Sequence, residues 1–366
     1  MQNPLGKKTR ARDLGIPLEG TPGETNAITD VQGVEVGHAT LISGHGKLVV
    51  GSGPVRTGVT AVLPRGKDFS AHVFAAWFAL NGNGEMTGTS WIEESGFLET
   101  PIMLTNTHSV GIVRDAVIEW QLRQGRLPDR WSLPVVAETF DGFLNDINGF
   151  HIKRAHVFEA LDTASPGPVL EGSVGGGTGT ICYEFKGGIG TASRKVDESI
   201  GGYTVGVLVQ ANHGRRKQLR IAGVPVGMEI TENLVWSEEA GSIVIVLATD
   251  APLLPHQLKR LARRASLGLA RTGAIASNYS GDIFIAFSTA NPEAEKASKI
   301  AQLTMFPNDR IDPILEATVQ ATEEAIINAL VAAETMVGID NRKVMAVPHD
   351  RLRQLMKAYN RLVDHP

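Results

Sequence analysis

Short apolar segments recur along the whole chain and predict a protein rich in β-strands. Six runs of four to seven residues are dominated by branched and other apolar side chains, which is the length and composition of buried strands. They cover residues 59–63, 101–104, 134–137, 204–210, 242–248 and 283–287. Glycine accounts for 40 of the 366 residues, so frequent turns are expected between these strands.

Three other segments have apolar residues three or four positions apart, the spacing of amphipathic helices. They are residues 109–123, 256–270 and 312–338. In the third, Asp312 and Pro313 suit a helix start and Gly338 suits a helix end. Its predicted apolar face consists of Leu315, Val319, Ile326, Leu330, Ala333 and Val337. Strand and helix segments alternate without a linker, which favours sheets covered by helices in one compact domain over residues 1–366.

Composition narrows the possible functions. The net charge of −4 gives no general reason to bind nucleic acid, and no apolar run approaches the roughly 20 residues that span a membrane. The one cysteine, Cys182, allows no internal disulfide and no cysteine-built zinc site. The basic start of the chain lacks the apolar segment of a secretory signal, so a cytoplasmic location is expected.

Several motif-like segments do not satisfy the requirements of known sites. The glycine-rich residues 171–180 and 53–60 lack the lysine or the glycine spacing of nucleotide-binding loops. His151 and His156 are five positions apart, which does not place both on one helix face for a metal, and no G-x-S-x-G segment offers a nucleophile elbow. No metal or organic cofactor is therefore expected.

The bond between Gly241 and Ser242 directly precedes a strongly apolar strand. Such a glycine commonly ends a turn and nothing more. Glycine can, however, adopt strained conformations that expose its carbonyl to the next hydroxyl, so Ser242 could attack it and free a serine N-terminus. That serine would carry its own base, because an α-amino group has a pKa of about 7.7–8.0.

Segments spread over nearly the whole chain resemble the L-aminopeptidase D-Ala-esterase/amidase and β-peptidyl aminopeptidase family. They include NAITDVQGVEVGHATL from Asn26, NGNGEMTG from Asn81, TNTHSVG from Thr105, AETFDGFLNDING from Ala137, GSVGGGTGT from Gly172, VQANHG from Val209, GSIVIVLATDAPLLPHQLKRLA from Gly241 and SGDIFIAFSTAN from Ser280. The resemblance implies an α/β fold of the N-terminal-nucleophile type, a four-layer α/β/β/α sandwich. It also implies self-cleavage into an α chain, residues 1–241, and a β chain, residues 242–366, with the αβ units assembled into a homo-oligomer.

The same resemblance assigns roles to individual residues. Ser242 corresponds to the nucleophile, Ser280 and Asp282 to the partners that orient it, and Asn212 to the donor that binds the oxyanion. Glu138 corresponds to the carboxylate that receives the substrate ammonium group. The implied substrates are small peptides, amino-acid amides and esters, including β-peptides or D-Ala derivatives.

Two positions depart from the family pattern. Phe140 stands where close relatives have tyrosine, so any hydroxyl contributed there is absent and the ring is expected to form a pocket wall. Asp282 stands where some relatives have glutamate, which shifts the carboxylate by about one methylene.

Two alternatives remain open at the level of the sequence. An acyltransferase of the ornithine acetyltransferase kind shares the self-processing logic, although it would normally offer threonine where Ser242 stands. A glycine-rich protein that binds a small molecule, with the Gly241–Ser242 bond intact, is the non-catalytic alternative.

Overall fold

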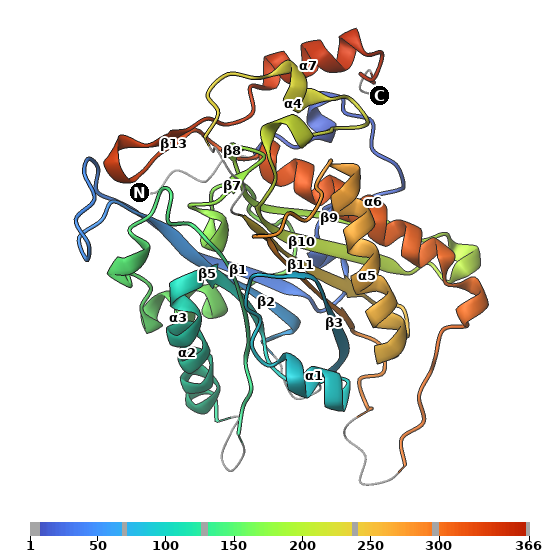
Figure 1. The fold of residues 1–366 in the computed structure, drawn as a ribbon. Coiled ribbons are helices and arrows are strands. Elements are labelled where there is room, and N and C mark those ends of the chain that lie inside the picture. Colours follow the sequence, from blue (N-terminus) through green and yellow to red (C-terminus); the bar gives the residue numbers. More distant parts are fainter. Residues whose placement is uncertain (1–7, 68–71, 126–130, 236–240, 295–299, 364–366) are drawn as a thin grey trace.

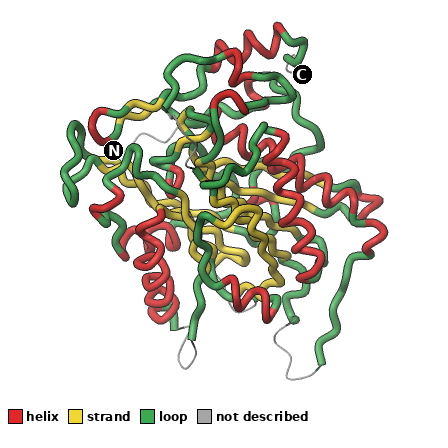
Figure 2. The backbone as a smooth tube through the Cα atoms, viewed as in Figure 1, coloured by secondary structure: helices red, strands yellow, loops and turns green. Residues whose placement is uncertain are grey.

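Two β-sheets lie face to face, and helices cover the outer face of each sheet (Figure 1). This computed structural model describes residues 8–67, 72–125, 131–235, 241–294 and 300–363. The strands occupy the middle of the molecule and the long helices its outside, as Figure 2 shows. The predicted α/β/β/α layering is confirmed.

The first sheet has the strand order β1-β2-β5-β6 within the described ranges. Its strands are β1 (Glu35–Ser43), β2 (Val55–Lys67), β5 (Ile102–Asn106) and β6 (Val135–Thr139). Only β5 and β6 run parallel in this sheet, and α2 (Val110–Arg123) connects them. Together with α3 (Arg154–Asp162), α2 packs on the outer face.

The second sheet has the order β4-β3-β12-β11-β10-β9 in the part of the chain that is described. Its strands are β3 (Val73–Gly82), β4 (Phe97–Leu98), β9 (Gly188–Lys195), β10 (Thr204–Asn212), β11 (Ser242–Thr249) and β12 (Gly281–Ser288). The central strands β11 and β12 run parallel and are connected by α5 (Pro255–Arg271). The outer face packs against α5 and α6 (Asp312–Val331).

Strand β11 shows why apolar runs rather than alternating patterns mark these strands. All eight of its residues are buried, because one face meets the other sheet and the other face meets the helices. Val244 and Val246 belong to the core between the sheets, whereas Ile243 and Ile245 belong to the core under α5 and α6. The site described below lies at the start of this strand.

Helix α6 begins where the sequence predicts but ends earlier. It spans Asp312–Val331 with Pro313 in its first turn, and residues 336–337 form the short strand β13 (Met336–Val337). The prediction of a helix to residue 338 was therefore wrong. The Nε2 atom of His349 lies 2.8 Å from the carbonyl oxygen of Val331 and satisfies one of the acceptors left at the helix end.

All six predicted strands and the other two predicted helices are present. The predicted elements did not include β1, β3, β4, β9, α3 and several further elements. These are α1 (Thr89–Ser95), α4 (Val226–Glu229), α7 (His349–Ala358), the hairpin of β7 (Ile181–Cys182) and β8 (Phe185–Lys186), and β14 (Lys343–Val344), which pairs with β13. None of the helices within the described ranges is both long and apolar enough to cross a bilayer.

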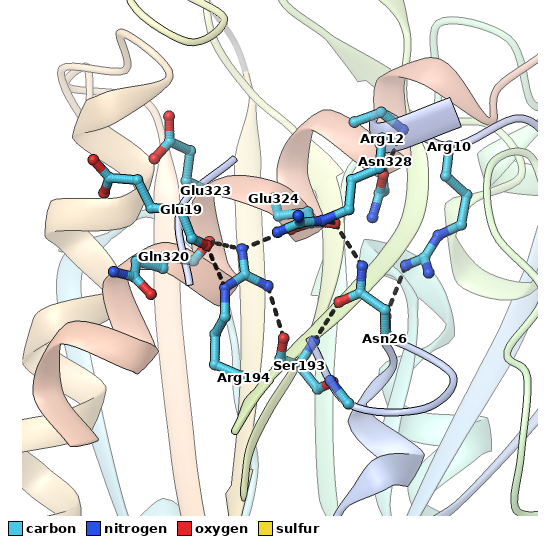
Figure 3. Close-up of polar contacts among 12 residues, drawn as sticks. Arg10, Arg12, Glu19, Asn26, Ser193, Arg194, Gln320, Glu323, Glu324 and Asn328 are labelled. Carbon is cyan, nitrogen blue, oxygen red and sulfur yellow. Dashed lines mark hydrogen bonds and ion pairs between the residues drawn. The ribbon is translucent and has the colours of Figure 1, made fainter. Parts of the chain in front are cut away.

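A buried ion-pair network holds the N-terminal segment against β9 and α6 (Figure 3). Its centre is Glu324 of α6. The carboxylate lies 2.9 Å from Nη2 of Arg12 and 2.6 Å from Nη2 of Arg194, and it accepts a 2.6 Å hydrogen bond from the amide of Asn26. The side chains of Arg194 and Glu324 are each 1% exposed. The network therefore joins parts of the chain that precede and follow Ser242.

Candidate active site

Three strand ends meet at one edge of the second sheet. In the strand register, Asn212 at the end of β10 lies opposite Ser242 at the start of β11, and Ser242 lies opposite Gly281 at the start of β12. The antiparallel pairing of β10 with β11 and the parallel pairing of β11 with β12 bring these ends together. Ser242 is 5% exposed. Residues separated by up to 70 positions in the sequence thus become neighbours around the predicted nucleophile.

Gly241 is required by space. A Cβ atom at this position would lie 2.3 Å from the carbonyl oxygen of Asn212 and 2.9 Å from Cα of His213, closer than real Cβ atoms approach other atoms. Gly241 is thus needed for close packing against the backbone of Asn212 and His213, and the strained conformation expected from the sequence stays a prediction. Its carbonyl oxygen accepts a hydrogen bond from the N–H of Gly281 at 3.2 Å.

Ser280 and Asp282 are joined as their spacing suggests. The hydroxyl of Ser280 donates to Oδ1 of Asp282 at 2.7 Å, and each residue is 1% exposed. They flank Gly281, the residue paired with Ser242, so the start of β12 places this hydroxyl–carboxylate pair beside the start of β11. The shorter side chain of aspartate therefore reaches the serine hydroxyl from this position.

The side chain of Asn212 is fixed by the β7–β8 hairpin. Its Oδ1 accepts the N–H of Ile181 at 2.8 Å, and the residue is 3% exposed. A backbone N–H can only donate, so the atom that it meets must be the amide oxygen. The NH₂ group therefore points away from Ile181 and is available as a hydrogen-bond donor.

Glu138 lies at the end of β6, in the first sheet, and is 6% exposed. Its carboxylate accepts the N–H of Glu85 at 3.1 Å and the hydroxyl of Thr107. Burial raises the pKa of Glu138 above its ordinary value, although these two bonds act in the opposite direction. A cation bound to this carboxylate would offset the unfavourable free energy of its desolvation.

Gly84 separates Glu138 from the start of β12. A Cβ atom on Gly84 would lie 3.4 Å from Oε1 of Glu138 and 3.2 Å from Cα of Gly281. The carboxylate from the first sheet is therefore brought close to the edge that carries Ser242. Gly84 and Thr107 lie in segments that carry the family resemblance, but spacing alone assigns them no role.

Phe140 follows Glu138 and is 41% exposed. Its ring lies against Gly142, where an added Cβ atom would come within 2.5 Å of Cζ. The ring thus packs against Gly142 and is otherwise accessible to a ligand or to solvent. The expectation that it forms a pocket wall stays a prediction.

Comparison with known proteins decides the family. Residues 26–344 match the model of peptidase family S58. This chain belongs to that family. It is 55% identical to a β-peptidyl aminopeptidase, BapA, of Sphingosinicella microcystinivorans, over 96% of this chain and 93% of the relative. As an S58 peptidase it is a hydrolase, and neither the acyltransferase nor the non-catalytic binding protein is favoured.

Solved structures of S58 relatives have the same fold. The L-aminopeptidase D-Ala-esterase/amidase of Ochrobactrum anthropi is 49% identical, with a TM-score of 0.91 over 97% of this chain and 99% of that one. That enzyme is described as a prototype of the serine aminopeptidases and a new variant of the Ntn hydrolase fold. A β-aminopeptidase of a Burkholderia species is also 49% identical, with a TM-score of 0.89 over 98% of this chain and 100% of that one.

The imidazole nearest in sequence to the predicted site residues is a poor candidate for a base. His213 follows Asn212, and burial lowers its pKa to about 3. Its Nδ1 atom lies 3.8 Å from Sγ of Cys182, a contact at the outer limit for sulfur. A ring that is so difficult to protonate would not hold a proton taken from Ser242.

A second group of buried charges lies behind the β7–β8 hairpin and was missed in the sequence. Burial raises the pKa of Asp141 to about 7 and lowers that of Lys186 to about 7, while the opposite charge of Asp141 partly restores the lysine value. The Nζ atom of Lys186 donates to the carbonyl oxygens of Gly177 and Gly187 at 3.2 and 2.9 Å. Asp141 lies in the segment AETFDGFLNDING, but spacing assigns neither residue a role, so only the fold reveals these contacts.

Proposed function

We propose that this S58 peptidase cleaves its own chain between Gly241 and Ser242 and then uses Ser242 to remove N-terminal residues from small peptides, amides and esters. The observation that carries the proposal is the strand register. It places Ser242 between Asn212 and Gly281, with the Ser280–Asp282 pair on the same edge.

In the self-cleavage step, the hydroxyl oxygen of Ser242 attacks the carbonyl carbon of Gly241. The peptide C–N bond breaks, the hydroxyl proton passes to the departing nitrogen, and an ester remains. Water then hydrolyses the ester and leaves a carboxylate on Gly241 and a free amine on Ser242. The N–H of Gly281 already donates to the carbonyl oxygen of Gly241, so it supports the negative charge that develops there.

In the mature enzyme, the amine of Ser242 accepts the hydroxyl proton as the oxygen attacks the substrate carbonyl. The NH₂ group of Asn212, held by Ile181, supports the oxyanion. An acyl-enzyme forms and the amine or alcohol product departs, after which water attacks the ester and releases the acid. The hydrogen-bonded pair of Ser280 and Asp282 orients the reacting amine.

Glu138 accounts for the choice of N-terminal residues. A buried carboxylate whose charge is destabilised by burial gains most from an ammonium partner, and only a substrate with a free N-terminus offers one there. The relatives named β-peptidyl aminopeptidase and L-aminopeptidase D-Ala-esterase/amidase support small β-amino acids, L-amino acids and D-Ala derivatives as acyl groups. We expect the αβ units to form a homo-oligomer.

The decisive experiment is an intact mass measurement of purified protein beside the variant Ser242→Ala. Wild type should give two chains that separate at Gly241–Ser242 and should release p-nitroaniline from aminoacyl p-nitroanilides. Ser242→Ala should remain one chain and be inactive. An active wild-type protein with an unbroken chain, or an active Ser242→Ala variant, contradicts the proposal.

A further inference from the structure

The segment that leads to the scissile bond is held by two buried side chains outside the site. Residues 230–235 contact the turn of the β7–β8 hairpin through Glu184 and Arg216, each 2% exposed. Both side chains bond to the backbone of this segment, so the contact does not depend on its side chains. Arg216 belongs to the basic stretch after His213, which plays no part in the chemistry described above.

Arg216 uses its whole guanidinium group in this contact. Nη1 donates to the carbonyl oxygens of Ile230 and Glu232, both at 3.1 Å. Nε and Nη2 donate to the carbonyl oxygens of Tyr183 and Glu184 at 3.0 and 2.7 Å. The planar group thus links the segment to the hairpin turn, with several donors in a fixed geometry that lysine cannot reproduce.

Glu184 connects the same two parts of the chain as a hydrogen-bond acceptor. Its Oε2 accepts the N–H of Val235 at 3.0 Å, and its Oε1 accepts the N–H of Arg216 at 3.1 Å. Tyr183 and Glu184 occupy the left-handed region, with φ of 50° and 60°. Such a conformation costs about 1–2 kcal/mol for each non-glycine residue, so the rest of the fold must hold this turn in place.

The same hairpin holds the oxyanion donor. Ile181, at its start, donates its N–H to Asn212, and Tyr183 donates its N–H to the carbonyl oxygen of His213 at 2.6 Å. Val235 packs into a small apolar cluster that includes Ile181. One rigid hairpin therefore contacts both the segment before the scissile bond and the strand end that faces Ser242.

We propose that Glu184 and Arg216 are positioning residues for self-cleavage. By holding residues 230–235 on the hairpin they restrict where the Gly241 carbonyl can lie relative to the Ser242 hydroxyl and the N–H of Gly281. Attack requires reacting atoms about 3–3.5 Å apart, so a fixed anchor seven residues before Ser242 increases the fraction of productive geometries. This inference rests on the proposed self-cleavage.

The inference separates two reactions that share one nucleophile. A substrate enters the mature site without being attached to residues 230–235, and Asn212 keeps its own bond from Ile181 at the start of the hairpin, so the hold on residues 230–235 has no part in turnover. Weakening the anchor should slow the appearance of two chains and leave the kcat and KM of the matured enzyme unchanged. A merely structural role would lower both reactions together.

The test follows the conversion of newly made precursor in a cell-free translation reaction by denaturing electrophoresis and intact mass. Arg216→Lys keeps the charge but not the fork of donors, and Glu184→Gln keeps the shape but not the charge. Arg220→Lys is the matched control, because Arg220 donates to the carbonyl oxygens of Lys217, Gln218 and Leu219 and to none in residues 230–235.

Arg216→Lys should convert at least about tenfold more slowly than wild type, equivalent to about 1.4 kcal/mol in the barrier. Its isolated two-chain form should hydrolyse aminoacyl p-nitroanilides with kcat and KM within about twofold of wild type. Glu184→Gln should behave in the same direction, and Arg220→Lys should convert at the wild-type rate.

The inference is overturned if both variants convert at the wild-type rate, or if the kcat of the matured variants falls by the same factor as the conversion. If Arg216→Lys gives no folded protein, Glu184→Gln decides by the same measurements. Failure of both to fold also counts against it, since the pair would then be needed for the fold itself. A wild-type chain that stays whole contradicts the self-cleavage proposal instead.

Discussion

At the scale of single residues, the site depends on how each polar group is held by its neighbours. The N–H of Ile181 orients the amide of Asn212, and Asp282 fixes the hydroxyl of Ser280. The family resemblance predicted roles for Asn212, Ser280 and Asp282. It could not identify Ile181, because a backbone N–H leaves no trace in the side-chain pattern.

Two substitutions at Asn212 should separate its structural role from its role as a donor. Asn212→Asp keeps an acceptor for Ile181 but has no NH₂ group. We expect its kcat to fall by about 10²–10³ with little loss of stability. Asn212→Ala should lose a similar factor in kcat and also about 1–3 kcal/mol of stability, since the buried N–H of Ile181 loses its acceptor. Steady-state kinetics of the matured enzyme and urea unfolding distinguish the two losses.

The acid side of the pH profile should contain a step from Glu138, separate from the step caused by protonation of the Ser242 amine. The pKa of Glu138 is raised by burial, and only its ionised form attracts the substrate ammonium group. As the pH falls through this raised pKa, the carboxylate is protonated, KM rises and kcat/KM declines. Glu138→Gln should have a high KM at every pH and lack the step from Glu138, while the step from the Ser242 amine remains. Profiles of kcat/KM between pH 4 and pH 9 check the expectation, which is wrong if the profiles of the variant and the wild type have the same shape.

At the scale of elements, most strands with continuous apolar runs were predicted, although β3 (VFAAWFALNG) was missed, and strands of mixed composition were not predicted. Strand β11 has eight buried residues, most of them branched, and its run in the sequence is unmistakable. Strand β9 has the sequence GIGTASRK, and only its last residue is exposed. Its Arg194 is buried because Glu324, 130 positions later in the chain, supplies the opposite charge. That partnership exists only in the folded molecule.

Glu324 should therefore be a sensitive position for stability. Burial alone would raise its pKa, but the bond from Arg12 and the charge of Arg194 lower it below the ordinary value. Glu324→Gln leaves the buried guanidinium of Arg194 without a counter-charge, a change that commonly costs about 3–5 kcal/mol. Urea unfolding of the inactive Ser242→Ala chain measures it, with Glu316→Gln on the exposed side of α6 as the control.

The same carboxylate predicts an acid-sensitive contribution to stability. Because the folded-state pKa of Glu324 is below its ordinary value of 4.5, its contribution is present above that pH and is lost as the pH falls through the folded-state pKa. Glu324→Gln should remove this contribution, so the difference in the free energy of unfolding between the wild-type residue and the variant should become smaller as the pH falls. If the difference in the free energy of unfolding stays constant down to pH 3, the stabilising contacts of Arg12 and Arg194 do not depend on the charge of Glu324.

At the scale of the whole molecule, the position of the proposed cut has a consequence for assembly. Ser242 begins β11, which lies between β10 from one side of the cut and β12 from the other. Made separately, residues 8–241 would lack two strands of the second sheet, β11 and β12, and residues 242–363 would lack its other four strands. We expect the two fragments to be insoluble alone and to give little activity when expressed together from two genes, measured against the single-chain protein.

The location of the bond inside the sheet also fixes the order of events during biosynthesis. In the proposed self-cleavage, the N–H of Gly281 can support the Gly241 carbonyl only after β11 and β12 have paired, so scission would report that this part of the sheet has formed. Translation as one polypeptide then supplies both pieces in equal number and already interlocked, and a molecule that misfolds stays uncut and without a free amine. Under the proposed self-cleavage, only copies that have reached the native topology would become active.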